Sequence, residues 1–253
     1  MPQALNWRVE HACFNAWPSL RHATQGDWLL RLSDGLSRRA NSVNALNANA
    51  TLENDGLANL HAIYRAQSLP LIVRVPTLLP HVDELLDRAG FVAEGESCVL
   101  HGALTDDNAR SDASVMITSQ PDNAWFTVMI DLQGYVPKQA EIYRRVIAMI
   151  ALPAGFATLY VDGEVAAVAY GVIDRGLLCC ESVIVSPSYR GRGLGGSLMR
   201  ALFDWARVNG ATAACLQVVA DNSAGRALYR GLGLTTELHR YHYRRLPSQM
   251  VQG

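Results

Sequence analysis

The chain has 253 residues, of which 49% are hydrophobic and 18% charged, and its 22 basic and 23 acidic side chains give a formal net charge of −1. This composition is typical of a globular protein with a full apolar core, in one large domain or two ordinary ones. The net charge is close to zero, so the chain lacks the excess of basic residues that is typical of proteins that bind nucleic acid or anionic membranes. We expect a small-molecule or peptide partner, with no nucleic acid and no membrane.

The first residues, 1–8, lack the basic start and apolar core of a signal peptide, and no run approaches the ~18 apolar residues of a membrane span. The five cysteines are odd in number and scattered, which suits a reducing compartment. Cys179 and Cys180 are adjacent, so in a strand they point to opposite faces and cannot easily bind one ion. These features predict a cytoplasmic protein that binds no metal.

The first half of the chain shows a short series of elements in its apolar pattern. The pattern predicts a strand at 71–75, a helix at 82–89 and a strand at 92–100. The same order recurs later, so that residues 85–91 align with residues 228–234, and Ser42-Val43 aligns with Ser182-Val183. We infer an internal duplication.

The boundary between the two copies falls in the segment 105–114, which is the longest stretch without apolar periodicity. It divides the chain into residues 1–112 and residues 113–253. In the first copy, Asn44–Thr51 stands where the second copy has a glycine-rich loop. Without glycine the backbone cannot approach a pyrophosphate closely, so the first copy is expected to hold no cofactor.

The second half is predicted as one unit of helices on an antiparallel-rich sheet. Its turn signals are Asp162-Gly163 and Asp174-Arg175-Gly176, which join three strands into a meander. The expected elements are a helix at 138–150, strands at 156–161, 165–173 and 177–185, a helix from 197, a strand at 214–219, a helix from about 222 to 230 and a strand at 239–246. The fold class is therefore α/β in the α+β sense, with a mixed, mostly antiparallel sheet flanked by helices and duplicated.

The segment after the meander is Arg190-Gly191-Arg192-Gly193-Leu194-Gly195-Gly196. A glycine-rich turn between a strand and a helix offers backbone N–H groups and a helix dipole to a phosphorylated cofactor. Gly191, Gly193 and Gly196 satisfy the GxGxxG pattern of nicotinamide-dependent oxidoreductases, with Asp221 downstream as a ribose ligand. The meander argues against that alternative, because a dinucleotide fold places helical crossovers between parallel strands.

Residues from about 113 to 253 resemble GNAT N-acetyltransferases. The resemblance rests on Arg190-x-x-Gly193-x-Gly195, on Val183 and Val185 in the preceding strand, and on Asn222 followed seven residues later by Tyr229. The whole chain also resembles tandem forms in which a degenerate GNAT-like half precedes an active one. The resemblance implies transfer of an acetyl group from acetyl-CoA to a primary amine, by direct attack in a ternary complex.

The resemblance also implies roles for individual residues. Tyr229 would be the general acid, since a phenol with a pKa of about 10 can protonate a thiolate whose conjugate acid has a pKa near 8.5. Asn222 would bind the cofactor arm, or only cap a helix. The expected acetyl-CoA contacts are Val183, Ile184, Val185, Arg190, Gly191, Arg192, Gly193, Leu194, Gly195, Gly196 and Asn222.

The general base is chosen from two strand positions. Gln217 stands where some family members have a glutamate, and an amide cannot take a proton. Glu181, expected in register with Val183 and Val185, is the better candidate, and the alternative is a structural pair with a nearby arginine. A non-catalytic acyl-CoA-binding or regulatory module is the main rival function, and a monomer or homodimer is expected.

Two further groups of polar residues are candidates of lower rank. Arg38 and Arg39, followed by Asn41 and Asn44, could line a cleft between the two halves. On the last strand, alternation places Tyr241 and Tyr243 on one face and His242 on the other. His239 and His242 are expected on the sheet surface.

Overall fold

The computed structural model describes residues 2–247, in which eleven strands form a single sheet in the order β1-β2-β3-β4-β11-β5-β10-β9-β8-β7-β6. The first-half strands are β1 (Arg21–Gln25), β2 (Trp28–Leu32), β3 (Val43–Ala45), β4 (Ile72–Pro76) and β5 (Val92–Ala103). The second-half strands are β6 (Val115–Thr118), β7 (Ala154–Val161), β8 (Glu164–Asp174), β9 (Leu177–Val185), β10 (Ala213–Val219) and β11 (Thr236–Arg245).

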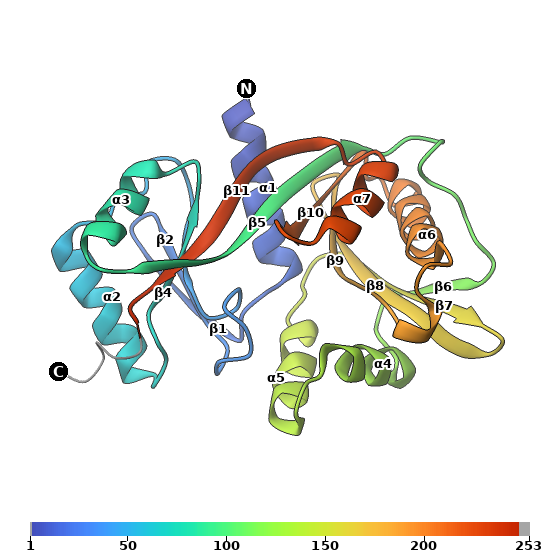
Figure 1. The fold of residues 1–253 in the computed structure, drawn as a ribbon, viewed down its shortest axis with the longest axis horizontal. Helices are drawn as coiled ribbons and strands as arrows, with labels where there is room; N and C mark the ends of the chain where they lie inside the picture. The colour runs from blue at the N-terminus through green and yellow to red at the C-terminus, as the bar shows by residue number, and fades with distance from the viewer. Residues whose placement is uncertain (1, 248–253) are drawn as a thin grey trace.

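Helices cover the sheet on both faces (Figure 1). They are α1 (Pro2–Ala16), α2 (Asn54–Ala66), α3 (Pro80–Arg88), α4 (Asn123–Gln133), α5 (Pro137–Ala148), α6 (Leu194–Val208) and α7 (Ser223–Gly231), with a 3₁₀ turn at Pro187–Tyr189. Within residues 2–247, only β3–β4 and β9–β10 are parallel pairs, and each has a helix in its crossover. The observed architecture is the mixed, mostly antiparallel sheet flanked by helices that the sequence predicts.

The strand order is nearly symmetric about its centre, which supports the inferred duplication. The series β3-α2-β4-α3-β5 has the same order and pairing sense as β9-α6-β10-α7-β11. The final strands are exchanged, because β11 pairs with β4 and β5 pairs with β10. In Figure 1, β5 and β11 run side by side through the middle of the molecule and join its two ends. The two sequence copies therefore share one continuous sheet.

The second half follows the predicted elements closely. The turns at Asp162-Gly163 and Arg175-Gly176 both have two successive positive φ angles, of 52° and 83° and of 50° and 77°. Successive positive φ angles define the hairpin turn that suits twisted strands, and they confirm the meander β7-β8-β9. The helix after the loop begins at Leu194, three residues earlier than expected, so Gly195 and Gly196 lie in its first turn.

Three apolar clusters fill the interior. One lies between the sheet and α1, α4 and α5, and includes Val9, Trp125 and Tyr143. Another lies on the opposite face under α6 and α7 and includes Leu198, and a third joins α2 and α3 to the first-half strands. The N-terminal helix α1 contacts β8, β9 and β10 of the second half, so it helps to cover that half's sheet.

A buried polar group lies where α1 crosses the exchanged strands. Glu10 on α1 pairs with Arg74 on β4 and accepts a hydrogen bond of 2.9 Å from His239 on β11. His239 is 6% exposed, which corrects the expectation of a surface position. The reason is the exchange, which carries β11 into the centre of the sheet. Tyr241 and Tyr243 share one face as predicted, and both are buried.

Within residues 2–247, no helix is long and apolar enough to cross a bilayer.

Candidate functional site

The two central parallel strands of the second half separate part-way along their length. β9 and β10 pair from Leu177 with Ala213 to Cys180 with Leu216. Beyond that point β9 continues beside β8, and β10 continues beside β5. A wedge-shaped gap therefore opens between Ser182–Val185 on one side and Gln217–Val219 on the other, and backbone polar groups that face it need another partner.

A bulge in β9 sits at the start of this gap. Ser182 has a φ of +53°, and the pairing of β8 with β9 shifts register here. A bulge inserts one residue and reverses the side-chain alternation that follows it. Val183 and Val185 therefore pack against the cluster under α6, whereas Ile184 packs against the cluster under α1.

The bulge corrects the expected orientation of Glu181. Glu181 precedes the inserted residue and lies on the face of Cys179, whose sulfur is 4.0 Å from its Oε1. Cys179 belongs to the cluster under α1, so Glu181 points away from the face of Val183 and Val185. The simple two-residue period placed all three on one face, because nothing in the sequence pattern shows the extra residue.

The glycine-rich loop forms the end of the gap. Gly191 and Gly193 both have a φ of +77°, and Gly193 is the N-cap of α6. Glycine adopts this conformation without strain, and the first N–H groups of a helix have no intrahelical acceptor, so Leu194 and Gly195 can present theirs to an anion. The N–H of Gly196 instead donates to the Gly193 carbonyl at 2.9 Å.

A cleft of about 800 Å³ connects the gap, the loop and α7. It is lined by ten of the eleven residues predicted to contact acetyl-CoA: Val183, Ile184, Val185, Arg190, Gly191, Gly193, Leu194, Gly195, Gly196 and Asn222. Arg192 is not in the lining, and its guanidinium carbon lies 5.3 Å from the Tyr189 ring centroid. Arg190 donates from Nε to the Val185 carbonyl at 3.2 Å, which ties the loop to the end of β9.

Asn222 caps a helix, and it also lies at the cleft. Its side-chain oxygen accepts a hydrogen bond of 2.9 Å from the Gly225 N–H and caps α7, while the residue also lines the cleft. A Cβ at Gly225 would lie 2.8 Å from the Asn222 amide nitrogen, so glycine is needed for this close approach. The neighbouring Asp221 makes no such cap.

Tyr229 lies on α7 and lines the cleft. Its side chain is buried, and burial raises the pKa of the phenol well above its usual value, with smaller contributions from Cys180 and Glu181. The hydroxyl is therefore fully protonated at neutral pH. The raised pKa also makes it a weaker acid than an exposed phenol, so the role of general acid stays a prediction.

Glu181 is paired with an arginine from the first half of the chain. Arg39 Nη1 lies 2.9 Å from Oε1 and 2.8 Å from Oε2 of Glu181, whose side chain is 3% exposed. Burial raises the pKa of this carboxyl, and the charge of Arg39 opposes the rise without cancelling it. A carboxyl in this state is a stronger base than an exposed one.

The other low-rank candidates have structural partners. Arg38 pairs with Glu94 at 3.2 Å, Asn41 accepts from the N–H groups of Ser33 and Gly35, and Asn44 is buried in contact with Ser42. Gln217 accepts a hydrogen bond of 3.2 Å from the Tyr241 hydroxyl.

Sequence analysis missed eight residues that line the cleft, among them Arg200 and Leu228, which lie next to the motif residues. Arg200 lies one helical turn after Gly196, and Leu228 directly precedes Tyr229. Helical spacing from the motif residues was the signal that could have found Arg200.

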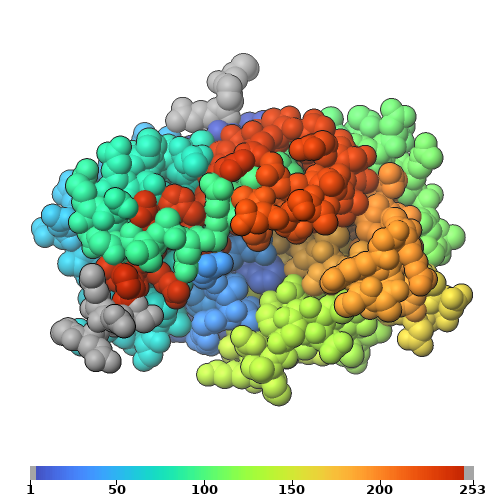
Figure 2. Space-filling view, in the orientation of Figure 1, coloured from blue at the N-terminus to red at the C-terminus, as the bar shows by residue number. Residues whose placement is uncertain are grey.

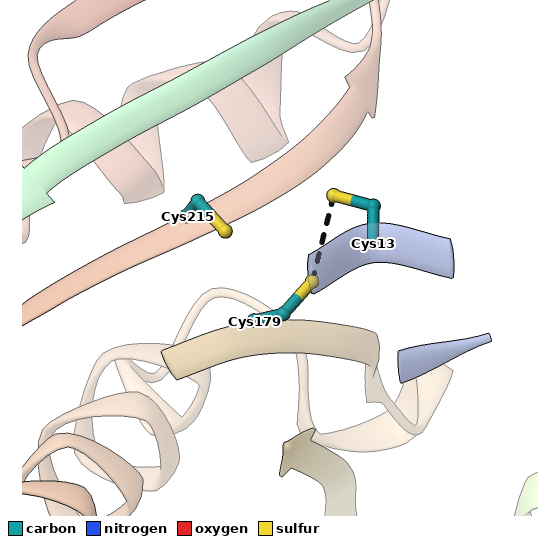
Figure 3. Close-up of side chains that lie close together, drawn as sticks. All are labelled: Cys13, Cys179 and Cys215. Carbon is teal, nitrogen blue, oxygen red and sulfur yellow. Dashed lines mark hydrogen bonds between the residues drawn. The ribbon is translucent and has the colours of Figure 1, made fainter. Parts of the chain in front are cut away.

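Three cysteines come together away from the cleft (Figure 3). The sulfurs of Cys13 on α1, Cys179 on β9 and Cys215 on β10 lie within 4.8 Å of one another, and all three residues are buried. Cys180 lies on the opposite face, as the strand pattern predicted. Among the described residues no fourth ligand joins the group, whereas structural zinc sites have four. Sequence spacing could not reveal the group, because only the fold brings α1 to these strands.

Comparison with known proteins agrees with this geometry. The family described as "Probable histone acetyltransferase Rv0428c C-terminal" matches residues 7–244, which is nearly the whole chain. The chain belongs to this family of GNAT N-acetyltransferases. A Bacillus subtilis relative, "Uncharacterized N-acetyltransferase YobR", is 26% identical over 245 residues, covering 94% of this chain and 97% of the relative.

Two solved GNAT structures share the fold. A GCN5-related N-acetyltransferase from Kribbella flavida has a TM-score of 0.71 at 19% identity, covering 96% of each chain. A tandem GNAT protein from the clavulanic acid biosynthesis pathway has a TM-score of 0.62 at 16% identity, covering 86% of this chain and 77% of its own. The match to a tandem structure agrees with the duplicated strand order.

Proposed function

We propose that this GNAT protein transfers an acetyl group from acetyl-CoA to a primary amine of a small molecule or peptide, by direct attack in a ternary complex. The observation that carries the proposal is the single cleft that joins the glycine-rich loop, the gap between β9 and β10, and Tyr229. A loop for a pyrophosphate, unpaired backbone for an extended arm and a buried proton donor are the three parts that such a reaction requires.

The loop and the gap would bind different parts of acetyl-CoA. The N–H groups of Leu194 and Gly195, with the dipole of α6 and the charges of Arg190 and Arg200, suit the pyrophosphate. The exposed main chain of Val183–Val185 suits the amide-containing arm. When bound, acetyl-CoA supplies a thioester whose acyl carbon the amine attacks.

Two side chains would move the protons. The amine loses one proton as the new C–N bond forms, and the thiolate gains one as the C–S bond breaks. Tyr229, which lines the cleft and stays protonated, would donate the proton to the thiolate. Glu181, on the opposite face of the gap, would accept the proton of the amine.

This arrangement divides the substrates between two faces of the sheet. The cleft lies on the face of α6 and α7, whereas Glu181 lies on the face of α1 and contacts the first half of the chain. In Figure 2 the molecule is hollowed between the red segment around α7, the orange segment around α6, the yellow-green segment of α5 and the blue first-half residues. We propose residues 113–253 as the catalytic part and residues 1–112 as a wall of the amine site.

The proposal is tested by incubating the protein with acetyl-CoA and a panel of small amines, polyamines and peptides, with release of the CoA thiol as the readout. Tyr229→Phe is expected to lower the rate about 100-fold, a typical contribution of a general acid, and to leave acetyl-CoA binding unchanged. Unchanged turnover in Tyr229→Phe would remove Tyr229 as the acid. Acetyl-CoA binding without transfer to any amine would favour a non-catalytic acyl-CoA-binding module.

A further inference from the structure

The Glu181 carboxylate is held by a residue of the other sequence copy. Arg39 lies in the connection between β2 and β3, and its Nη1 contacts both carboxylate oxygens. The Arg39 guanidinium also stacks on Trp17, with 4.3 Å from its central carbon to the ring centroid. Stacking fixes the plane of the guanidinium, and a fixed guanidinium loses little freedom when it binds a carboxylate.

The pair of Arg39 and Glu181 lies at the start of the gap between β9 and β10. Glu181 follows Cys180, the last residue of β9 that pairs with β10, and precedes the Ser182 bulge. The carboxylate therefore lies where the two strands separate, on the face away from the cleft. In the proposed function the amine approaches from that face, where the Glu181 carboxylate lies at the point of strand separation.

We propose that Arg39 is a positioning residue that keeps Glu181 ionised and oriented as the base at the gap, so that the degenerate half completes the site of the catalytic half. This inference rests on the proposed function, in which Glu181 takes the proton of the amine. Without Arg39, a carboxyl that is almost fully buried has no adjacent cation to oppose its desolvation.

Other titratable groups also face Glu181, but their effects are smaller or have the opposite sign. Arg31 on β2 lowers its pKa through charge alone, and Cys13 on α1 raises it. The remaining neighbours are Cys179 and Cys180 on β9, Tyr170 on β8, Tyr143 on α5 and Tyr229 on α7. Arg39 is the cation that forms hydrogen bonds with Glu181, so its removal is expected to change the ionisation most.

The first experiment measures the ionisation of Glu181 directly. The protein is labelled with ¹³C at the glutamate carboxyl carbon, and the Glu181 signal is assigned by its loss in Glu181→Gln. Removal of a cation in contact raises a carboxyl pKa by about 1–3 units, so Arg39→Ala is expected to titrate at least about 1 unit higher than the wild type. Arg39→Lys, which keeps the charge, is expected to lie between the two.

Arg38→Ala is the matched control. It removes the same charge from the adjacent residue, which pairs with Glu94 and not with Glu181. It is expected to leave the Glu181 titration unchanged. An Arg39→Ala protein that titrates like the wild type, or an equal shift in Arg38→Ala, would overturn the inference. The Arg39→Lys protein decides the question if Arg39→Ala fails to fold.

The second experiment links the ionisation to catalysis. The acidic limb of the kcat/KM profile is expected to move to higher pH in Arg39→Ala, by the same amount as the carboxyl pKa, while the Kd for acetyl-CoA stays unchanged. A slower variant with an unmoved limb would mean that Arg39 acts only on structure and would refute the positioning role. Because the carboxyl titration needs no acceptor, failure of the wild type to acetylate any amine would refute the proposed function and leave the measured coupling intact.

Discussion

Replacing Glu10 with glutamine is expected to remove the main source of acid sensitivity of this fold. Glu10 is 1% exposed, and burial alone would raise its pKa. The charge of Arg74 and the hydrogen bonds from His239 and Arg74 outweigh burial and lower the pKa from 4.5 to about 2. The ionised Glu10 carboxylate therefore joins α1 to β4 through Arg74 and to the exchanged strand β11 through His239.

The magnitude follows from the difference in pKa between the folded and unfolded chains. A folded pKa below the unfolded value gives stability that is present above about pH 4.5 and is lost as the pH falls toward about 2. The full contribution is about 3 kcal/mol, of which about 2 kcal/mol is lost by about pH 3. At neutral pH, Glu10→Gln also leaves Arg74 buried without a countercharge, at a cost of about 3–5 kcal/mol.

Urea unfolding followed by circular dichroism at about pH 7 and about pH 3 measures both effects. The variant is expected to be less stable at neutral pH and to lose about 2 kcal/mol less than the wild type on acidification. Glu84→Gln is the control, because Glu84 forms an exposed pair with Arg88 on α3, and exposed pairs add little stability. If Glu10→Gln loses as much stability on acidification as the wild type, the buried ion pair does not work as described.

Three further predictions concern the cleft and the core. Gly193→Ala adds strain of about 1–2 kcal/mol at a positive φ without a steric clash. It should weaken acetyl-CoA binding, whereas Gly163→Ala, with similar strain in a distant hairpin, should change only the free energy of unfolding. Asn222→Ala should lose a helix cap worth about 1 kcal/mol and also acetyl-CoA affinity, and Asp221→Ala should lose neither. Because all five cysteines are buried, the native protein should react with thiol reagents only as fast as it opens. Rapid modification of any cysteine would contradict that burial.

The sequence predicted the second half well because its signals are local. Asp162-Gly163 favours one type of hairpin turn, and the apolar runs on both sides of it indicate where each strand begins and ends. Tyr229 and ten of the eleven predicted cofactor contacts line one cleft, because a motif fixes its own geometry from strand to turn to helix. Their roles in binding and catalysis remain predictions.

The features that sequence analysis missed depend on long-range contacts or on irregular backbone. The Ser182 bulge places Glu181 on the face opposite Val183. The alternation of side chains in the sequence does not reveal the bulge. The exchange of β5 and β11 carries His239 into the centre of the sheet, although its own strand resembles a surface strand. The contact of Arg39 with Glu181 joins residues 142 positions apart, and only the folded chain shows it.

Calorimetric titration with acetyl-CoA tests the central claim most directly. The structure predicts one binding site per chain, because residues 113–253 contain the glycine-rich loop and the cleft, while Asn44–Thr51 offers no glycine at the equivalent place. The same protein is expected to show no binding of NADH. Binding of NADH in place of acetyl-CoA, or acetyl-CoA binding that Gly193→Ala leaves unchanged, would contradict the assignment of this cleft.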